Sequence, residues 1–272
     1  MTNHMSVGSD AENLVVRTDE GAIACLTLSS PGSLNALSDA MLDVLAKQLS
    51  QIAQDPSVRV VILRGAGKAF CAGHDLKEMT AARAAPDGGA AYFADLFDRC
   101  GQLMQAIPRL PQPVIAQVHG IATAAGCQLV ATCDMAVAAE GTRFGVNGVN
   151  IGLFCSTPMV ALSRNVPRKQ AFEMLTTGDF IAADRAQELG LVNRVVPHAA
   201  LETETLALAK QVADKLARAV RIGKRAFYDQ LDQDLSGAYA LTRDAMVQNM
   251  LDSDTAEGIA AFIEKRAPTW EQ

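Results

Sequence analysis

The sequence contains no long hydrophobic run, no dense cluster of basic residues and no recognisable export signal. None of its apolar stretches approaches the roughly 18 residues that can span a bilayer. Residues 1–12 are polar, without the apolar segment of a secretory signal or the arginine bias of a transit peptide. The net charge is −6, which argues against nucleic-acid binding. We therefore expect a cytoplasmic protein that binds neither membranes nor nucleic acid.

The sequence also lacks paired metal ligands and intact nucleotide-binding motifs. Its six cysteines form no C-x-x-C pair and its four histidines have no metal-ligand spacing, so we expect buried free thiols, a reducing compartment and no metal. The glycine-rich segment that begins at Gly65 fails as a phosphate loop, because Ala69 stands where Ser or Thr is needed after Lys68. It fails as a dinucleotide motif because Phe70 occupies the third glycine position. We expect no redox cofactor.

Strand and helix patterns alternate through the first two-thirds of the chain and give way to helices after Pro197. Hydrophobic residues make up 49% of the chain, enough for one large core. This order predicts an α/β core over residues 13–197 and a helical region over 198–272. The predicted strands are Leu14–Thr18, Ala22–Leu28, Val58–Leu63, Val114–Val118 and Met135–Ala138, and the predicted helices are one capped by Ser38 and running to Gln54, Ala90–Ile107 and Ala124–Ala131.

Two strand-to-helix turns are built from small residues, Ala69–Leu76 and His119–Leu129. Small residues let backbone N–H groups reach a ligand, and a helix start adds unsatisfied donors and a positive dipole end. Two such donors suit an oxygen that gains negative charge, as in a thioester enolate, and one donor contributes ~3–4 kcal/mol to transition-state stabilisation. Taken singly, each turn fits equally well with tight packing of a helix on a sheet.

Together the two turns resemble the signatures of the crotonase (enoyl-CoA hydratase/isomerase) family. Further matches follow in order within residues 13–270, at Ser33–Leu37, Thr177–Asp179, Gly190–Val192 and Gly258–Arg266. The resemblance implies a crotonase-like spiral of strand-strand-helix units, a helical C-terminal trimerisation region, an acyl-CoA ligand, and a homotrimer or hexamer. By position, the family's oxyanion donors fall on the backbone N–H groups of Ala72 and Ala125. The segment Gly148–Pro158 is similar to one subgroup, whose members carry a hydratase name.

The sequence departs from the family at the acid–base positions. Hydratases of the family activate water with two glutamates, and the first lies three residues after the second donor, where this chain has Gln128. The second follows a Phe-Gly-x-x pattern, where this chain has Gly148. Some relatives carry an aspartate eight residues further on, where this chain has Ser156. Carboxylates are therefore missing from all three positions.

The resemblance implies a set of residues around the acyl-CoA. His74 is a candidate base, because an imidazole with a pKa of about 6.5 suits proton transfer, although it fits equally as a loop residue that contacts CoA. Asp75 could instead cap the following helix. Lys265 matches a position that reaches CoA from a neighbouring subunit, and an exposed helix lysine fits as well. The full set expected to contact substrate is Leu34, Ala36, Gly73, His74, Asp75, Leu76, Gln128, Gly148, Cys155, Ser156, Phe262 and Lys265.

Three functions fit these features. The first is a hydratase- or isomerase-like enzyme that polarises the thioester carbonyl with the two backbone donors. The second is decarboxylation of a malonyl-type CoA or other enolate chemistry in the same site, which needs no strong base. The third is acyl-CoA binding without catalysis. In each, coenzyme A enters only as part of the ligand.

Overall fold

The computed structural model describes residues 13–271, and its strands form two sheets. The large sheet has the order β1-β2-β3-β4-β6-β9 and the small one β5-β7-β8. Only the β1–β2 pair of the large sheet is antiparallel. The strands are β1 (Val15–Glu20), β2 (Ile23–Leu28), β3 (Val60–Gly65), β4 (Val114–Val118), β5 (Ile121–Thr123), β6 (Met135–Ala139), β7 (Arg143–Gly145), β8 (Ile181–Ala182) and β9 (Arg194–Val196).

The chain repeatedly passes from the large sheet to the small sheet and then into a helix. β4 and β5 lead into α5 (Ala125–Thr132), and β6 and β7 lead into the short helix η2 (Asn147–Ile151). This is the strand-strand-helix repeat that the family resemblance implies. The remaining helices are η1 (Pro31–Ser33), α2 (Asp39–Ala53), α3 (Leu76–Ala82), α4 (Ala90–Arg109), α6 (Pro158–Asn165), α7 (Arg168–Thr177), α8 (Ala183–Glu188), η3 (His198–Ala200), α9 (Leu201–Ala213), α10 (Ala217–Leu231), α11 (Leu235–Met250) and α12 (Ser253–Glu264).

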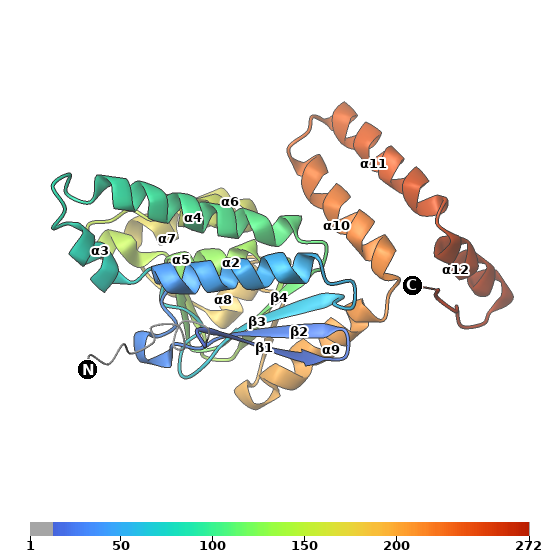
Figure 1. The fold of residues 1–272 in the computed structure, drawn as a ribbon, viewed down its shortest axis with the longest axis horizontal. Helices are drawn as coiled ribbons and strands as arrows, with labels where there is room; N and C mark the ends of the chain where they lie inside the picture. The colour runs from blue at the N-terminus through green and yellow to red at the C-terminus, as the bar shows by residue number, and fades with distance from the viewer. Residues whose placement is uncertain (1–12, 272) are drawn as a thin grey trace, which may run out of the picture.

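Helices cover both faces of the large sheet (Figure 1). Successive side chains of a strand point to opposite faces. In β3, Val61 and Leu63 join the core under α2 and α4, whereas Val60 and Ile62 join a second core under α9. A strand buried on both faces explains the apolar run Val60–Leu63 within the predicted strand Val58–Leu63.

Local capping signals in the sequence are confirmed. The Ser38 side chain accepts a hydrogen bond from Met41 N and begins α2, and the Asp75 carboxylate accepts from Lys77 N and Glu78 N and begins α3. Each such cap stabilises its helix by about 1 kcal/mol. The predicted helix Ala90–Ile107 is α4, which extends to Arg109. All six cysteines are buried and free, as predicted.

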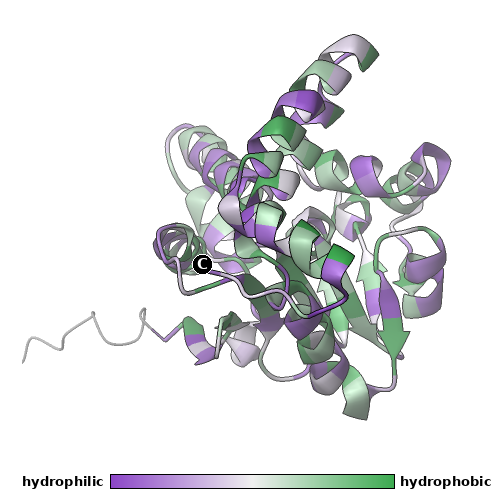
Figure 2. Ribbon diagram, turned by 90° about the vertical axis from the view of Figure 1, so that its right-hand side faces the viewer, coloured by the Kyte–Doolittle hydropathy of each residue, from purple (hydrophilic) through white to green (hydrophobic). Residues whose placement is uncertain are grey.

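The last three helices form an arm that projects from the core (Figure 1). The arm begins at α10 rather than at residue 198, because α9 packs on the sheet through Leu201, Leu208 and Ala209. Figure 2 shows hydrophobic residues, in green, recurring along the helices of the arm. Many large apolar side chains of the arm are exposed in the single chain, which is typical of an interaction surface. They are Phe227, Leu231, Leu235, Tyr239, Met246, Val247, Met250, Leu251, Ile259, Phe262 and Ile263.

No helix within residues 13–271 is both long enough and apolar enough to cross a membrane.

A buried ion pair fastens the arm to the core. Lys224 Nζ on α10 donates to Asp134 Oδ2 at 2.7 Å, to Ile107 O at 3.0 Å and to Gln112 O at 2.8 Å. Tyr228 donates to the other oxygen of Asp134 at 2.8 Å. Burial lowers the pKa of Lys224, an effect that the Asp134 charge opposes. Every proton of the ammonium group has an acceptor, so the charge is accommodated away from water.

We predict that Lys224→Met destabilises the protein by about 3–5 kcal/mol, because it leaves the Asp134 carboxylate buried without its cation. Lys210→Met is the matched control, since Lys210 pairs with Glu20 at 2.9 Å on the surface. An exposed pair contributes only about 0–1 kcal/mol. Urea unfolding of both variants measures the difference, and equal losses would contradict the role given to Lys224.

Candidate active site

Direct backbone pairing joins the two predicted turns. Cys71 N donates to Ile121 O at 3.2 Å and Thr123 N donates to Cys71 O at 3.1 Å. Gly126 makes this approach possible, because a Cβ there would lie 2.2 Å from Cys71 O. The turns follow β3 and β4, which are parallel neighbours, so they meet at the carboxyl-terminal edge of the sheet, where ligands of α/β proteins commonly bind.

The predicted first donor is already engaged in the structure. Ala72 N donates to Leu34 O at 3.0 Å, so this N–H group holds the loop rather than pointing to a free site. Within residues 13–271, the backbone N–H groups of His74 and Ala125 donate to no carbonyl or side chain. Ala125 is the first residue of α5, which has no side-chain cap, as expected of an open helix start. His74 N and Ala125 N are therefore two unengaged donors, one on each turn.

Gly73 brings these two segments into contact. Its φ is +91°, and a Cβ on it would lie 3.0 Å from Ala124 Cβ, 3.1 Å from Thr123 O and 3.3 Å from Ala125 N. A left-handed backbone and the missing side chain both require glycine here. Gly73 therefore leaves the space in front of Ala125 N unfilled.

Asn35 positions the surrounding loops, although we did not predict it as a site residue. Its side chain is fully buried, and its amide group donates to Ala66 O at 2.8 Å, Ala69 O at 2.9 Å and Phe70 O at 3.2 Å. Its backbone φ is +55°, a conformation that asparagine tolerates better than most residues. Its place inside Ser33–Leu37, one of the segments that carry the family resemblance, could have indicated that Asn35 positions the site.

His74 is a neutral, largely buried imidazole beside the donors. Its Nδ1 lies 3.4 Å from Leu37 O, and its ring meets Phe97 edge-on with centroids 5.8 Å apart. Burial lowers the pKa of His74, and this effect outweighs the bond to Leu37 and the charge of Asp39. Its Nε2 is buried with no hydrogen-bond partner.

The structure closes the second glutamate position. A Cβ on Gly148 would lie 2.3 Å from Leu153 O and 2.9 Å from Cys155 Sγ. The Gly148 N–H group donates to the Cys155 sulfur at 3.4 Å, so the thiol occupies this side of the loop. Burial raises the pKa of Cys155 and keeps it a neutral thiol rather than a nucleophilic thiolate. Gln128, at the first glutamate position, is 4% exposed.

The other predicted contact residues are dispersed. Ala36 is buried, Leu76 is half exposed, and Ser156 is exposed. Phe262 and Lys265 lie on the arm at the end of α12, at the opposite end of the molecule from α3 (Figure 1). One chain alone does not bring them to the two turns.

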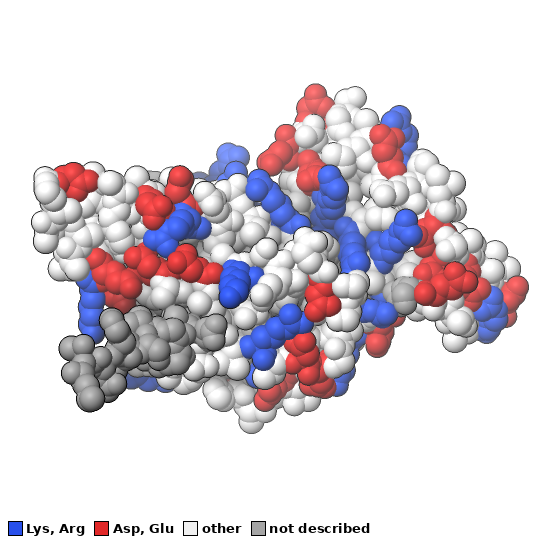
Figure 3. Space-filling model, in the orientation of Figure 1, with Lys and Arg blue, Asp and Glu red and all other residues white. Residues whose placement is uncertain are grey.

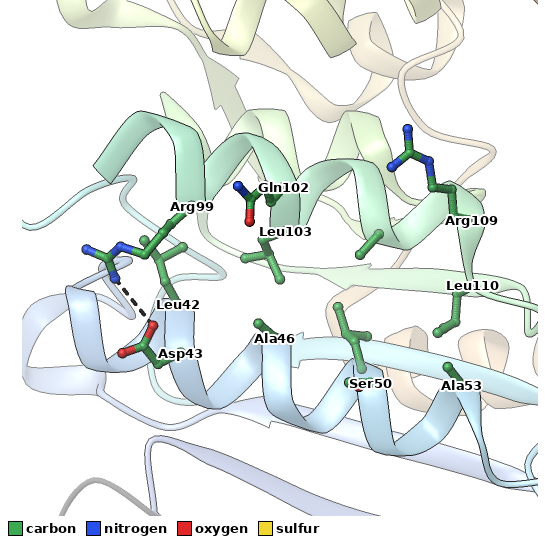
Figure 4. A pocket seen from close by; sticks show the side chains of 12 residues that line it. Leu42, Asp43, Ala46, Ser50, Ala53, Arg99, Gln102, Leu103, Arg109 and Leu110 are labelled. Atoms are coloured by element: carbon green, nitrogen blue, oxygen red, sulfur yellow. Dashed lines mark hydrogen bonds and ion pairs between the residues drawn. The ribbon is translucent and has the colours of Figure 1, made fainter. Parts of the chain in front are cut away.

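The groove between α2 and α4 is separate from these turns (Figure 4). It is lined by apolar residues such as Leu49 and Leu103 and bordered by Arg99, which pairs with Asp43 at 3.3 Å. It contains none of the predicted contact residues. The chemistry of the turns, rather than the size of a groove, therefore identifies the site.

Comparison with known proteins decides the family. The profile described as Enoyl-CoA hydratase/isomerase matches residues 18–272. The chain belongs to the enoyl-CoA hydratase/isomerase family. A crystal structure of an enoyl-CoA hydratase from Mycobacterium smegmatis is 54% identical, with a TM-score of 0.91 over 95% of this chain and 99% of that one. The predicted crotonase-like fold is thereby confirmed.

The subgroup that the segment Gly148–Pro158 resembles is enoyl-CoA hydratase domain-containing protein 3, and the comparisons confirm this resemblance. The mouse protein named "Enoyl-CoA hydratase domain-containing protein 3, mitochondrial" is 47% identical over 264 residues, which covers 97% of this chain and 86% of that protein. A crystal structure of human enoyl Coenzyme A hydratase domain-containing protein 3 is 46% identical to this chain. Its TM-score is 0.90, over 94% of this chain and 100% of that one.

The prediction of a cytoplasmic protein is wrong by the same comparison. The vertebrate relatives from mouse, rat, frog, human and zebrafish are all named mitochondrial. That prediction rested partly on the polar character of residues 1–12, which lie outside the described part of the structure, and partly on the lack of a long apolar run and of paired cysteines.

We predict that Gly148→Ala destabilises the protein by about 1–3 kcal/mol, because the added methyl group must displace the Leu153 carbonyl. Gly101→Ala is the control, since Gly101 lies within α4 with nothing within 4 Å of its added Cβ. Alanine should stabilise that helix by about 0.5–1 kcal/mol. Denaturant unfolding measures the change in the free energy of unfolding for both variants. An unchanged stability of Gly148→Ala would show that the Leu153 carbonyl moves aside at little cost.

The lowered pKa of His74 predicts a pH dependence of stability. Between the lowered folded pKa and the unfolded value of about 6.5, the unfolded chain binds more protons, so the free energy of unfolding decreases as the pH falls through this window. His74→Gln should reduce this slope by at most about 1.4 kcal/mol per pH unit. Unfolding curves between pH 4.5 and 7.5 measure it, and an unchanged slope would contradict the burial of a neutral imidazole.

Proposed function

We propose that this protein binds an acyl-CoA thioester with its carbonyl oxygen between the N–H groups of His74 and Ala125, where it stabilises negative charge on that oxygen. The observation that carries the proposal is that these two donors, on adjoining turns, have no acceptor within residues 13–271. Membership in the enoyl-CoA hydratase/isomerase family supports an acyl-CoA ligand.

The surrounding structure supports a preorganised pair of donors. Asn35 and the Ala72–Leu34 bond restrain one loop, and α5 places its positive dipole end at Ala125. Donors held in position before the ligand arrives stabilise an enolate without reorganisation. Removing one such donor typically costs ~3–4 kcal/mol in transition-state stabilisation.

Water addition is disfavoured in this site. The amide of Gln128 does not act as a base, and position 148 has no room for a carboxylate side chain. The proposed chemistry is therefore polarisation of the thioester and proton exchange at the adjacent carbon. His74 is the candidate proton acceptor, because its imidazole is neutral and its Nε2 is unoccupied by a partner.

We further propose a homotrimer or hexamer, in which the exposed apolar side chains of the arm are covered by other copies. In such an assembly Phe262 and Lys265 would approach the acyl-CoA of a neighbouring subunit. Their distance from the turns of their own chain supports this arrangement (Figure 1).

The test compares wild type with Gly73→Ala for binding of butyryl-CoA by calorimetry. The added methyl group would sit within 3.3 Å of Ala125 N, so we expect binding to weaken at least ~10-fold. Gly141→Ala is the control, because its φ of +77° imposes similar strain but nothing lies within 4 Å of its added Cβ. Equal losses in both variants, or no butyryl-CoA binding by wild type, would refute the site.

Catalysis is measured separately on the wild type. Exchange of the butyryl-CoA α-protons with deuterium, followed by NMR, should exceed the buffer rate, whereas crotonyl-CoA should gain no water. Binding of butyryl-CoA without proton exchange would support the non-catalytic alternative. Hydration of crotonyl-CoA would contradict the proposal that the site, which lacks a carboxylate at position 148, does not add water.

A further inference from the structure

Two clefts meet at the end of α4, away from the proposed thioester site. The first, of about 590 Å³, is the groove between α2 and α4, and the second, of about 860 Å³, lies between the end of α4 and the helices α10 and α11. Arg109 and Leu110 line both clefts, so the two form one continuous depression around the end of α4. Each cleft has the volume of a small-molecule site. The turns Ala69–Leu76 and His119–Leu129 contribute no residue to either lining.

The groove between α2 and α4 is apolar, and its far end has no spare positive charge. Leu49 and Leu103 are almost fully buried and form its floor, and small side chains such as Ala46 leave it open above. Figure 4 shows Arg99 and Arg109 at opposite ends of the groove. The Arg99 guanidinium is already paired with three carboxylates, those of Asp39, Asp43 and Asp95. An anion therefore finds a free partner only at the Arg109 end.

Two arginines of the second cleft have no acidic partner within residues 13–271. Arg109 donates to Gln105 Oε1 at 3.2 Å, and Arg221 donates to Pro56 O at 3.4 Å. In Figure 3, basic side chains gather where the end of α4 meets α10. Guanidinium groups form their strongest hydrogen bonds with carboxylates and phosphates. Arg109 and Arg221 are therefore available to an anionic ligand.

The other charged groups of the second cleft limit the charge that a ligand can carry. Arg225 pairs with Asp229 at 3.4 Å, and Asp244 pairs with Arg243 at 2.7 Å. Asp229 and Asp244 line the same cleft as the two available arginines. A doubly charged phosphate would meet more repulsion from these carboxylates than a singly charged head group would. A carboxylate, which arginine binds with two parallel hydrogen bonds, fits this balance of charge.

The loop that carries Arg109 is held in place before any ligand binds. Lys224 Nζ donates to Ile107 O and Gln112 O, one on each side of the loop, and Pro108 and Pro111 restrict the backbone between them. Lys224 also places its positive charge at the carbonyl end of α4. The charge of Arg109 is therefore not required to stabilise that helix end.

We propose that the joined clefts bind a free fatty acid, with its carboxylate at Arg109 and Arg221 and its alkyl chain in the groove between α2 and α4. The lining follows α2 from Leu42 to Ala53, a length of about 16 Å at 1.5 Å per residue, which suits an extended chain rather than a short one. This second site lies apart from the proposed thioester site and does not depend on it. Because the second cleft lies between the core and the arm, the bound acid contacts both.

Calorimetry with sodium laurate, below its micelle concentration, tests the site on the whole protein. Butyrate keeps the carboxylate without the long chain, dodecyltrimethylammonium reverses the charge on the same chain, and dodecyl phosphate carries the more highly charged head group. We expect laurate to bind at least ~10-fold more tightly than each of these, because only laurate combines apolar burial with a single negative charge. Tighter binding of any of the three overturns the proposal.

Two variants test the head-group position. Arg109→Gln and Arg221→Gln each remove one cation and should each weaken laurate binding about 10-fold, since a hydrogen bond to a charged group is lost. Arg185→Gln is the matched control, because Arg185 pairs with Glu188 at 2.7 Å on α8 and lines neither cleft. Laurate affinity should not change in the control. Equal weakening in all three variants would reveal a general effect of net charge and overturn the assignment.

A further pair of variants tests the position of the chain. Ala46→Phe places a large side chain in the groove and should weaken laurate binding at least ~10-fold. Gln51→Phe is its control, because Gln51 is exposed on the same helix and lies outside the lining. Thermal unfolding of each variant shows that it is folded. Unchanged laurate affinity in Ala46→Phe, or an equal loss in Gln51→Phe, overturns the placement of the chain.

Saturation with butyryl-CoA distinguishes the two proposed sites. Laurate affinity should be the same with and without bound butyryl-CoA, because the clefts and the turns share no residue. Competition between the two ligands overturns this inference, since laurate would then occupy the thioester site. Failure of laurate to bind also overturns it and leaves the proposed function standing. Failure of butyryl-CoA to bind overturns the proposed function, and laurate binding that is lost in Arg109→Gln would still support the second site.

Discussion

The short backbone pairing between Cys71 and the segment Ile121–Thr123 is the constraint on which the site depends. It brings together two turns that leave neighbouring parallel strands, and it requires an approach too close for side chains. A Cβ at Gly120 would lie 2.1 Å from Lys68 O, and one at Gly126 would lie 2.2 Å from Cys71 O. Because the backbones touch, Gly73 lies against Ala124 and Ala125, and the free N–H groups of His74 and Ala125 belong to adjoining segments.

The same close packing limits the chemistry. Leu153 O and Cys155 Sγ fill the space that a side chain at position 148 would need. This loop therefore has no room for a glutamate at the position where the hydratases carry their second one. What is left at the site is a pair of backbone donors and uncharged acceptors. In the function that we propose, such a set would hold and polarise a thioester rather than activate water.

The arm and the site share one anchor. The Asp134 carboxylate accepts from Lys224 of α10 and also from Val114 N at 2.6 Å, at the start of β4. β4 leads directly into the turn that ends at Ala125. Asp134, which holds Lys224 of the arm, therefore also holds the start of the strand that leads to Ala125, one of the two donors that we propose. Covering of the arm by other copies of the chain would act on the same anchor.

The sequence by itself determined the local features of this protein. The apolar run at Val60–Leu63, the caps at Ser38 and Asp75, and the two small-residue turns follow from side-chain chemistry within a few residues, and each is confirmed as a strand, cap or turn. The absence of glutamate at Gln128 and Gly148 is likewise a fact of the sequence. The family resemblance required only the order of such segments.

Only the tertiary structure decided which groups are free to act. Whether the N–H of Ala72 or of His74 is available depends on the carbonyl of Leu34, a residue distant in sequence that the fold brings within 3.0 Å of Ala72 N. The closure of position 148 depends on the path of the loop to Cys155, and the place of α9 in the core depends on the second face of the sheet. Hydrogen-bond availability and empty space are properties of atoms brought together by folding, and no local pattern of residues reports them.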